Sequence, residues 1–559
     1  MKKIYKVIGF YVLFFGLNLL LLSYEFDIII KNGRIIDGTG NPWFYGDVGV
    51  KDGKIVFVGK TGNGNAKKVI ESRSLVVAPG FIDVLDQSDF TILVDGNAES
   101  KIRQGVTTLI YGEGGSAAPL TDFIKNEWKR EAEHYGITLD WTTLKEYYEK
   151  LMKGGISVNI ATYVGAAQVR MAVIGAENRE PTHDELERMK QLVAQAMEDG
   201  AVGISSALIY PPGSFAKTDE LIELCKVVSK YGGIYATHIR NEGDRQVEAL
   251  KEAIEIGMKA NLPVEIFHFK VAGKENWGNS KIAISLIEEA RSKGLDITAD
   301  QYPYIASSTS INATVPPWVH EGGTEKYLSR LQDKELRKKI KDEMLHKKEG
   351  WENMYLGPGG WENILIASLK QEKNKIYEGK SVSEAAKIAK KDPFEFVFDL
   401  IVEEKGSVGA IYFSMAENDV KAIMKTPWVM IDSDWSALRP DGILGEGKPH
   451  PRAYGTFPRV LGKYVREEKI LTLEDAIRKM TSFPAQRFKF KDRGLIWEGM
   501  SADITVFNPE TVIDKATFQN PHQYPEGIEY VIVNGILVID KGNHTGARSG
   551  KILYGPGKK

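Results

Sequence analysis

Short apolar runs alternate with segments of helical period through the middle of the chain. Eight runs have the length of strands and lack the polar alternation of a half-exposed sheet, which is typical of parallel strands buried on both faces. They lie at residues 81–85, 106–111, 157–164, 201–207, 233–238, 263–268, 296–301 and 428–434. Helical patterns such as 182–199 and 218–230 fall between them. Eight strand–helix units predict a (β/α)8 barrel of the TIM type.

Both ends of the chain show short alternating strands separated by turn residues. Strands are predicted near the N-terminus at 27–31, 34–37, 46–51, 54–59 and 75–77, with Asn32-Gly33 and Asp52-Gly53 as turns. Near the C-terminus they are predicted at 503–507, 528–534 and 536–540, with Asn534-Gly535 as a hairpin turn. We expect both ends to form one composite β-sandwich domain, residues 24–78 plus 505–559. The barrel would then occupy residues 79–504.

A long interval, about 320–406, separates the seventh and eighth predicted barrel strands. It is rich in Lys and Glu and has a helical texture. We expect an inserted subdomain that lies over the mouth of the barrel as a lid.

The first 23 residues differ from the rest of the chain. Lys2, Lys3 and Lys6 precede an uninterrupted apolar run at 7–22. A basic region followed by a run of this length is typical of a secretory signal. An uncleaved N-terminal anchor is the alternative, because the run falls just short of a membrane span. We therefore expect export to the periplasm or the extracellular space, with membrane contact only through this segment.

Composition limits the classes of molecule that the protein is expected to bind. The chain has 559 residues, is 43% hydrophobic and carries a formal net charge of -2, so it can bury a large core and offers no basis for binding nucleic acid. The same balance offers no basis for binding an anionic membrane surface. The single cysteine, Cys225, excludes an intrachain disulfide and is expected to pack in the helix at 218–230.

Polar side chains end three of the predicted buried strands. His238 ends the fifth strand, His268 the sixth and Asp434 the eighth. A (β/α)8 barrel carries its catalytic groups at the carboxyl ends of its strands. One histidine in such a place is more often a packed core residue. Two histidines and an aspartate at matching strand ends indicate a metal or acid–base site.

Nine stretches of the chain resemble, in order, the amidohydrolase superfamily, and more closely its N-acyl-D-amino-acid deacylase (D-aminoacylase) branch. They are DIIIKNGRIIDGTG, VAPGFIDV, RQGVTTLIYGEGG, AVGISSALIYPPG, YATHIRNEGD, ITADQYPYIASST, HPRAYGTFPRVL, MSADITVFNP and HTGARSGKIL. They extend from about Asp27 to Leu553. The resemblance implies a metal-dependent hydrolase barrel that carries a β-sandwich built from both termini.

The same resemblance implies roles for individual residues. His238 and His268 match the two zinc-binding histidines, and Asp434 matches the catalytic aspartate. Five further residues fall where the deacylases hold the carboxylate and the acyl carbonyl of their substrate: Tyr210, Lys270, Tyr302, Ser308 and Arg452. The planar fork of Arg452 suits a carboxylate. A simple ion pair with a surface acid is the alternative for this arginine.

The chain departs from the family at the first strand. The superfamily normally has a His-x-His pair there, whereas this chain has Leu85 and Gln87, and neither is a good zinc ligand. The fourth strand ends without a lysine. The branch also has a cysteine after the second strand, where an ungapped register places Gly114 beside Glu113. We expect Glu113 to replace the thiolate, with helix capping or solvent exposure as the alternative.

These features predict a site for one divalent metal per chain, bound by Glu113, His238 and His268. Zinc is the first choice, and the carboxylate ligand makes manganese or iron(II) the alternatives. With Asp434 as the base, the expected reaction is hydrolysis of a small-molecule substrate, an N-acyl amino acid, and the resemblance implies the D configuration. The alternatives are hydrolysis of another amide (a cyclic imide, ureide or dipeptide) and a non-catalytic binding protein that has lost the first metal position.

Overall fold

The computed structural model describes residues 25–61, 64–347 and 349–559 of the chain. At its centre lie eight parallel strands, and each overlaps one of the predicted barrel strands. They are β6 (Phe81–Asp86), β7 (Val106–Tyr111), β8 (Asn159–Thr162), β10 (Gly203–Ala207), β11 (Ile234–His238), β12 (Val264–Ile266), β13 (Ile297–Gln301) and β17 (Val429–Ile431). The predicted (β/α)8 barrel is therefore present.

Two hydrogen-bonded runs of strands together form the closed barrel. One run is β6-β7-β8, and the other leads from the short β9 (Val164–Gly165) through β10, β11, β12 and β13 to β17. Only Tyr163 separates β8 from β9. A parallel bridge between Asp86 and Trp435 joins β6 to the chain that follows β17. Because all the strands are parallel, their carboxyl ends meet at one mouth.

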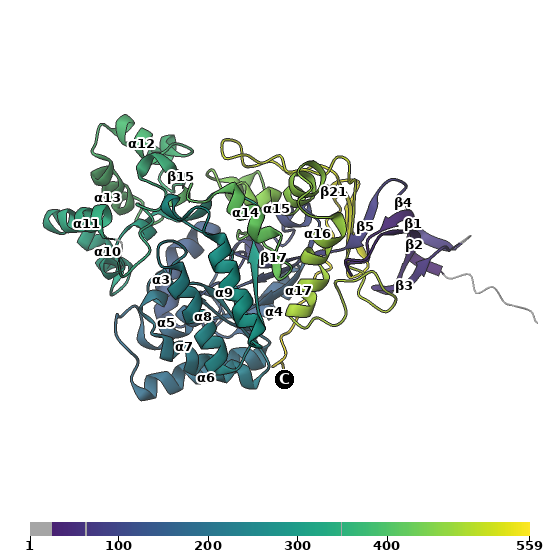
Figure 1. The fold of residues 1–559 in the computed structure, drawn as a ribbon, viewed down its shortest axis with the longest axis horizontal. Helices are drawn as coiled ribbons and strands as arrows, with labels where there is room; N and C mark the ends of the chain where they lie inside the picture. Colours follow the sequence, from purple (N-terminus) through teal and green to yellow (C-terminus); the bar gives the residue numbers. More distant parts are fainter. Residues whose placement is uncertain (1–24, 62–63, 348) are drawn as a thin grey trace, which may run out of the picture.

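Amphipathic helices cover the outside of the barrel (Figure 1). They include α6 (His183–Asp199), α7 (Thr218–Lys230), α8 (Gln246–Ala260) and α9 (Ser280–Ser292). Helix α6 begins at a capping box, in which Thr182 and Glu185 each accept a hydrogen bond from the backbone of the other. It ends at Gly200, whose φ of 113° few other residues adopt. Cys225 is fully buried on α7, as expected.

Strands from both ends of the chain form one nine-stranded sheet beside the barrel (Figure 1). The N-terminal strands are β1 (Glu25–Ile35), β2 (Phe44–Lys51), β3 (Lys54–Gly59), β4 (Asn65–Glu71) and β5 (Val76–Pro79). The C-terminal strands are β18 (Ile504–Phe507), β19 (Ile528–Val533), β20 (Ile536–Asp540) and β21 (Asn543–His544). Antiparallel pairing of β5 with β18 joins the two ends. Apolar side chains of both ends share one core cluster, so the two ends fold as one unit.

Local details of this domain differ from the sequence prediction. The expected turn at Asn32-Gly33 is a bulge inside the continuous strand β1, because Asn32 adopts a φ of 59° and its backbone N–H donates to Asp47. Strand β4 was not predicted, since its residues alternate too weakly in polarity. The tail after β21 leaves the sheet: Leu553 hydrogen-bonds to Ile160 of the barrel. The hairpin at Asn534-Gly535 is present, with both residues at positive φ.

The insertion after β13 is wider than the predicted interval of about 320–406. It contains a three-stranded antiparallel sheet, β14 (Ser307–Ser310), β16 (Gly409–Tyr412) and β15 (Ile364–Ser368). Its helices are α10 (Thr324–Gln332), α11 (Lys334–His346), α12 (Val382–Ala389) and α13 (Pro393–Glu403). It has its own apolar core and projects from the barrel on the side away from the β-domain (Figure 1). The Ser/Thr-rich strand β14 has no apolar alternation, so the pattern could not predict where the insertion begins.

The predicted signal or anchor, residues 1–23, lies outside the described residues. Among the residues that the structure describes, no helix is both long enough and apolar enough to cross a membrane.

A buried lysine connects the first and eighth strands of the barrel. Lys101 Nζ lies 3.1 Å from Asp83 and 2.8 Å from Asp86, and all three side chains are inaccessible to solvent. The same ammonium donates to the hydroxyl of Ser433 and, at 2.6 Å, to the carbonyl of Trp435. Lys101 therefore fixes the chain on both sides of residue 434.

Replacing Lys101 by alanine should lower the free energy of unfolding by about 3–5 kcal/mol, because it leaves two buried carboxylates without their cation. Urea denaturation followed by tryptophan fluorescence measures the loss. Lys293→Ala is the matched control, since its pair with Glu289 is largely exposed and its removal should change stability little. Equal losses in the two variants would contradict a structural role for the Lys101 network.

Candidate active site

A cavity of about 330 Å³ opens at the carboxyl ends of the barrel strands. It is lined by all nine residues that the sequence pointed to: Glu113, Tyr210, His238, His268, Lys270, Tyr302, Ser308, Asp434 and Arg452. Most of them follow a barrel strand directly, whereas Ser308 belongs to the insertion and Arg452 begins helix α15 (Arg452–Arg459). The fold thus brings together residues that are more than 300 positions apart in sequence.

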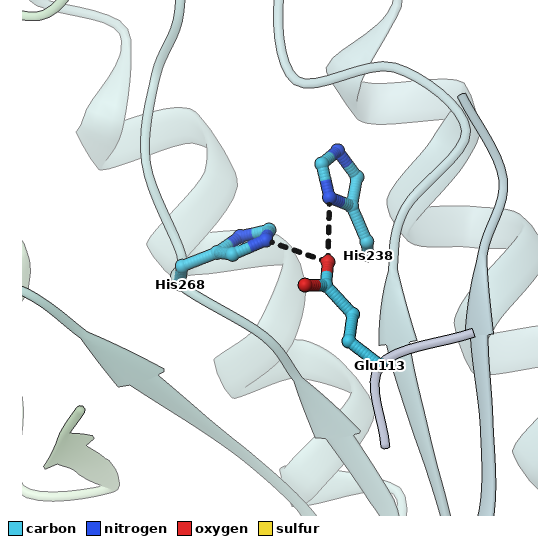
Figure 2. Close-up of side chains that lie close together, drawn as sticks. All are labelled: Glu113, His238 and His268. Atoms are coloured by element: carbon cyan, nitrogen blue, oxygen red, sulfur yellow. Dashed lines mark hydrogen bonds and ion pairs between the residues drawn. The ribbon is translucent and has the colours of Figure 1, made fainter. Parts of the chain in front are cut away.

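Three of these side chains converge on one point (Figure 2). Glu113 Oε1 lies 2.9 Å from His238 Nδ1 and 3.1 Å from His268 Nε2. One candidate ligand atom from each residue lies within 4.8 Å of the other two. Two imidazole nitrogens and one carboxylate oxygen are the donor set of an open zinc site. The residues present therefore fit a divalent metal ion.

Glu242 contacts the outer nitrogens of both histidines. Its Oε1 lies 3.0 Å from His268 Nδ1, and its Oε2 lies 3.6 Å from His238 Nε2. Lys270 Nζ, at 2.5 Å from Oε1, neutralises this buried carboxylate. A carboxylate that accepts from the outer N–H of a histidine leaves the other nitrogen free as a metal ligand. The distance to His238 Nε2 is too long for a hydrogen bond, and Lys270 Nζ also lies 2.8 Å from His268 Nδ1. Glu242 can therefore help to hold His268 in the orientation that a metal requires, and it lies beside His238.

The charges of the cluster favour a cation. Burial raises the pKa of Glu113, but hydrogen bonds from His238 and His268 lower it more, to well below its usual range. Burial lowers the pKa of His268, but the surrounding carboxylates raise it more, to about 10. His268 thus holds a proton at neutral pH in the metal-free protein. Because a metal binds only the neutral imidazole, a divalent ion would take the place of this proton.

Two site residues have strained backbone conformations. His268 has a φ of 35° and Asp434 a φ of 44°, both in the left-handed region that side chains other than glycine seldom adopt. Hydrogen bonds hold them there: the His268 N–H donates to the Asp300 carboxylate, and the Asp434 N–H donates to the Leu85 carbonyl at 2.9 Å. Both side chains line the cavity directly after their strands end.

Asp434 is paired with Arg452. Arg452 Nη2 lies 2.8 Å from Asp434 Oδ2, and the arginine is only 1% exposed. The candidate base and the candidate carboxylate anchor are therefore in direct contact, and the acid that pairs with Arg452 is a buried residue of the cavity and not a surface one. The guanidinium also lies over the ring of Tyr302, at 4.3 Å. Its Nε and Nη1 are buried and have no hydrogen-bond partner among the described residues.

Leu85 and Gln87, at the first-strand positions of the family's His-x-His pair, lie in different environments. Leu85 is buried in an apolar cluster of the barrel. Gln87 lines the cavity and donates to both Glu113 and Asp434. The neighbouring acids do not supply a second metal site: Asp86 pairs with Lys101, and Asp89 lies outside the lining of the cavity.

The remaining substrate-binding candidates are already engaged within the protein. Lys270 pairs with Glu242. The hydroxyl of Tyr302 points to the sulfur of Met415, at 3.7 Å, so this residue offers its ring rather than its hydroxyl. Ser308 donates its hydroxyl to the Ala410 carbonyl at 2.7 Å.

Tyr210 lies beside His238, one of the candidate metal ligands. Its ring packs edge-on against the imidazole of His238, with centroids 5.3 Å apart. Burial raises the pKa of the phenol well above its usual value, so the hydroxyl stays protonated. Of the five candidates, Tyr210 and Arg452 therefore lie next to the central groups of the site, Tyr210 beside His238 and Arg452 beside Asp434.

Several cavity residues were missed or undervalued from the sequence. Glu242 lies in the polar segment that follows the fifth strand. Its position four residues after His238 is the sequence signal that could have identified it. Gln87 was judged only as a poor ligand. Met354 lines the cavity from the insertion, and Trp435 lines it next to Asp434. No local pattern marks either residue.

A closed parallel barrel with a metal-ligand cluster and a carboxylate at its mouth defines a metal-dependent hydrolase of the TIM-barrel type. Comparison with known proteins agrees. The chain matches the amidohydrolase family over residues 372–539 and the N-terminal domain of the urease alpha-subunit over residues 21–81. D-aminoacylase from Alcaligenes xylosoxydans xylosoxydans is 35% identical over 532 residues, covering 95% of this chain and 98% of that protein.

Two solved structures match over 95% of this chain and 100% of theirs. One is N-acyl-D-glutamate deacylase from Bordetella bronchiseptica, complexed with zinc and a phosphonate that mimics the tetrahedral intermediate (TM-score 0.79, 31% identity). The other is a D-aminoacylase with a binuclear metal center, for which one-metal activation and second-metal attenuation are described (TM-score 0.77, 34% identity).

The chain therefore belongs to the amidohydrolase family, in the branch of the D-aminoacylases, as the sequence resemblance predicted. Its enzyme class is that of hydrolases acting on carbon–nitrogen bonds other than peptide bonds. The predicted fold class is confirmed as well.

Glu242→Gln should weaken zinc binding by about 10–100-fold, because the neutral amide no longer compensates Lys270 and holds His268 less well. Competition with a chelating dye measures the affinity. Glu248→Gln, on the exposed face of α8, is the control and should bind zinc like the wild type. An unchanged affinity in Glu242→Gln would show that the two histidines are held by other contacts.

Proposed function

We propose that this chain hydrolyses the amide bond of an N-acyl amino acid, releasing a carboxylic acid and a free amino acid. The observation that carries the proposal is the joint presence, in one cavity, of the Glu113–His238–His268 cluster and the Asp434–Arg452 pair. The first can hold a metal, and the second combines a base with a cation that can bind a carboxylate.

The proposed cofactor is one divalent ion per chain, with zinc as the first choice. Glu113, His238 and His268 would hold it, and Glu242 would help to orient His268. A divalent ion in such a site would acidify a water molecule and polarise the scissile carbonyl. The zinc in the related glutamate deacylase structure supports this assignment.

Asp434 is the proposed proton carrier. It would accept the proton of the attacking water and deliver it to the nitrogen of the leaving amine. The Arg452 guanidinium lies 2.8 Å from its Oδ2. The Gln87 amide faces the other oxygen, Oδ1, at 3.3 Å. Both contacts keep the side chain in one orientation in the cavity.

Arg452 is the proposed anchor for the substrate carboxylate, through the two guanidinium nitrogens that have no partner among the described residues. The names of the relatives, which act on N-acyl-D-amino acids, support a D substrate. A second cavity of about 230 Å³ shares Ser308, Thr309, Trp435 and Ser436 with the site and gives room for a larger acyl group or side chain. Cyclic imides, ureides and dipeptides are the competing substrates in the assay.

We also propose that the protein is exported. The support is the sequence alone: a basic start followed by the apolar run at 7–22. Cell fractionation with an antibody against the barrel tests this proposal.

Purified protein given excess zinc and then dialysed should retain one zinc per chain by elemental analysis. His238→Ala and His268→Ala should lose it, and Glu113→Ala should weaken binding at least about tenfold, because each removes one of three ligands. Two equivalents in the wild type would contradict the single site. None would favour a non-catalytic binding protein.

Asp434→Asn should lower kcat for N-acyl-D-amino acids at least about a thousandfold, because the amide cannot take a proton from water. Zinc content should remain at the wild-type value, since no metal ligand is changed. Steady-state assays with a panel of N-acetyl-D- and L-amino acids, next to cyclic imides and ureides, measure both rate and substrate class. A kcat above a tenth of the wild-type value would show that another group is the base.

Arg452→Ala should raise KM and also lower kcat, because the arginine contacts both the proposed substrate carboxylate and Asp434. The two effects are separated by comparing an N-acetyl amino acid with its carboxamide. The wild type should prefer the acid, and the variant should hydrolyse both at similar low rates. A preference that survives the substitution would exclude Arg452 as the carboxylate anchor.

A further inference from the structure

Gln87 lies between two carboxylates that come from different strands. Its Nε2 is 2.5 Å from Glu113 Oε2, after the second barrel strand, and 3.3 Å from Asp434 Oδ1, after the eighth. Gln87 itself follows the first strand, β6. The amide thus connects a proposed metal ligand to the proposed base.

The orientation of the amide follows from its neighbours. Ionised carboxylates only accept hydrogen bonds, so the NH2 group and not the carbonyl of Gln87 must face them. The amide has two N–H groups, and each carboxylate can accept one. The backbone carbonyl of Gln87 accepts a hydrogen bond from the Ser436 hydroxyl at 2.5 Å, which ties the residue to the loop that carries Asp434.

The other charges of the cavity are already paired. Arg452 contacts Oδ2 of Asp434, and the two histidines contact Oε1 of Glu113. For the remaining oxygens, Oε2 of Glu113 and Oδ1 of Asp434, Gln87 is the hydrogen-bond partner that the described residues provide. Two anionic oxygens thus face a single point, and a neutral amide occupies it. In the absence of that amide, a cation would be the natural occupant.

We infer that Gln87 is a positioning residue that occupies, with a neutral amide, the place of a second cation between Glu113 and Asp434. Its donors hold the base in line with the metal site without adding a charge to the cavity. This inference rests on the proposed function, since it assigns Gln87 a role in the same reaction. It also explains how the first strand can lack metal ligands while the site keeps its shape.

The inference is tested by the number of metal ions that the protein binds. Gln87→Glu is nearly isosteric but replaces two donors by acceptors, so three carboxylates would surround one point. This variant should bind a second equivalent of zinc. Gln87→Met keeps the size without the donors. It should still bind one equivalent, but lower kcat at least about tenfold while KM stays within about threefold, because the base loses its alignment.

The experiment compares wild type, Gln87→Glu, Gln87→Met and Thr309→Glu. Thr309 lines the same cavity from β14, so Thr309→Glu adds a carboxylate to the part of the wall that the insertion supplies and should bind one equivalent. Zinc is counted by elemental analysis after dialysis and by calorimetric titration of the apoprotein, and thermal melting verifies folding. If Gln87→Glu does not fold, Gln87→His places a nitrogen ligand at the same point and should also gain a second equivalent.

The outcomes separate this inference from the proposed function. One equivalent in folded Gln87→Glu, or a wild-type kcat in Gln87→Met, overturns the role of Gln87 while wild-type hydrolysis stands. A second equivalent in Thr309→Glu also overturns it, since any added acid would then suffice. Absence of both metal and hydrolysis in the wild type overturns the proposed function itself, whatever the Gln87 variants bind.

Discussion

The site depends on one carboxylate oxygen that two histidines share. Glu113 Oε1 lies within 3.1 Å of a nitrogen of each. The three residues follow strands two, five and six of the barrel, so this contact exists only when the barrel is closed. A buried cluster of this kind is costly unless a cation balances it. The requirement explains the neighbouring contacts, in which Glu242 lies 3.0 Å from the outer nitrogen of His268 and Lys270 in turn balances Glu242.

Two further sets of buried charges in the barrel are paired in the same way. Asp434 is balanced by Arg452, and the acids beneath the mouth, Asp83 and Asp86, by Lys101. Lys101 also holds the residues on either side of Asp434, which helps to maintain the left-handed backbone at that position. The stability of the barrel and the geometry of the base are thus linked through one buried network.

The insertion is part of the site and not only a cover for it. It contributes Ser308 and Met354 to the cavity. Glu352 accepts a hydrogen bond from the backbone N–H of Glu242 at 2.6 Å, which connects the insertion to the loop that orients the metal ligands. Burial raises the pKa of Glu352 to about 8. Because of the hydrogen bond between Glu352 and Glu242, movement of the insertion would also move the segment beside the two histidines.

The sequence by itself determined the barrel, the composite β-domain and the residues of the site. These follow from local signals: apolar runs of strand length, and polar residues at the point where each run ends. It also showed that the first strand lacks its histidines. Only the tertiary structure decided which side chains of the site contact one another. The pairing of Asp434 with Arg452, the contact of the Tyr302 hydroxyl with Met415 and the position of Gln87 between two acids depend on which strand ends become neighbours. Hydrophobic pattern specifies that a segment is buried, whereas a hydrogen bond between residues 347 positions apart, such as that of Gln87 with Asp434, is specified only by closure of the barrel.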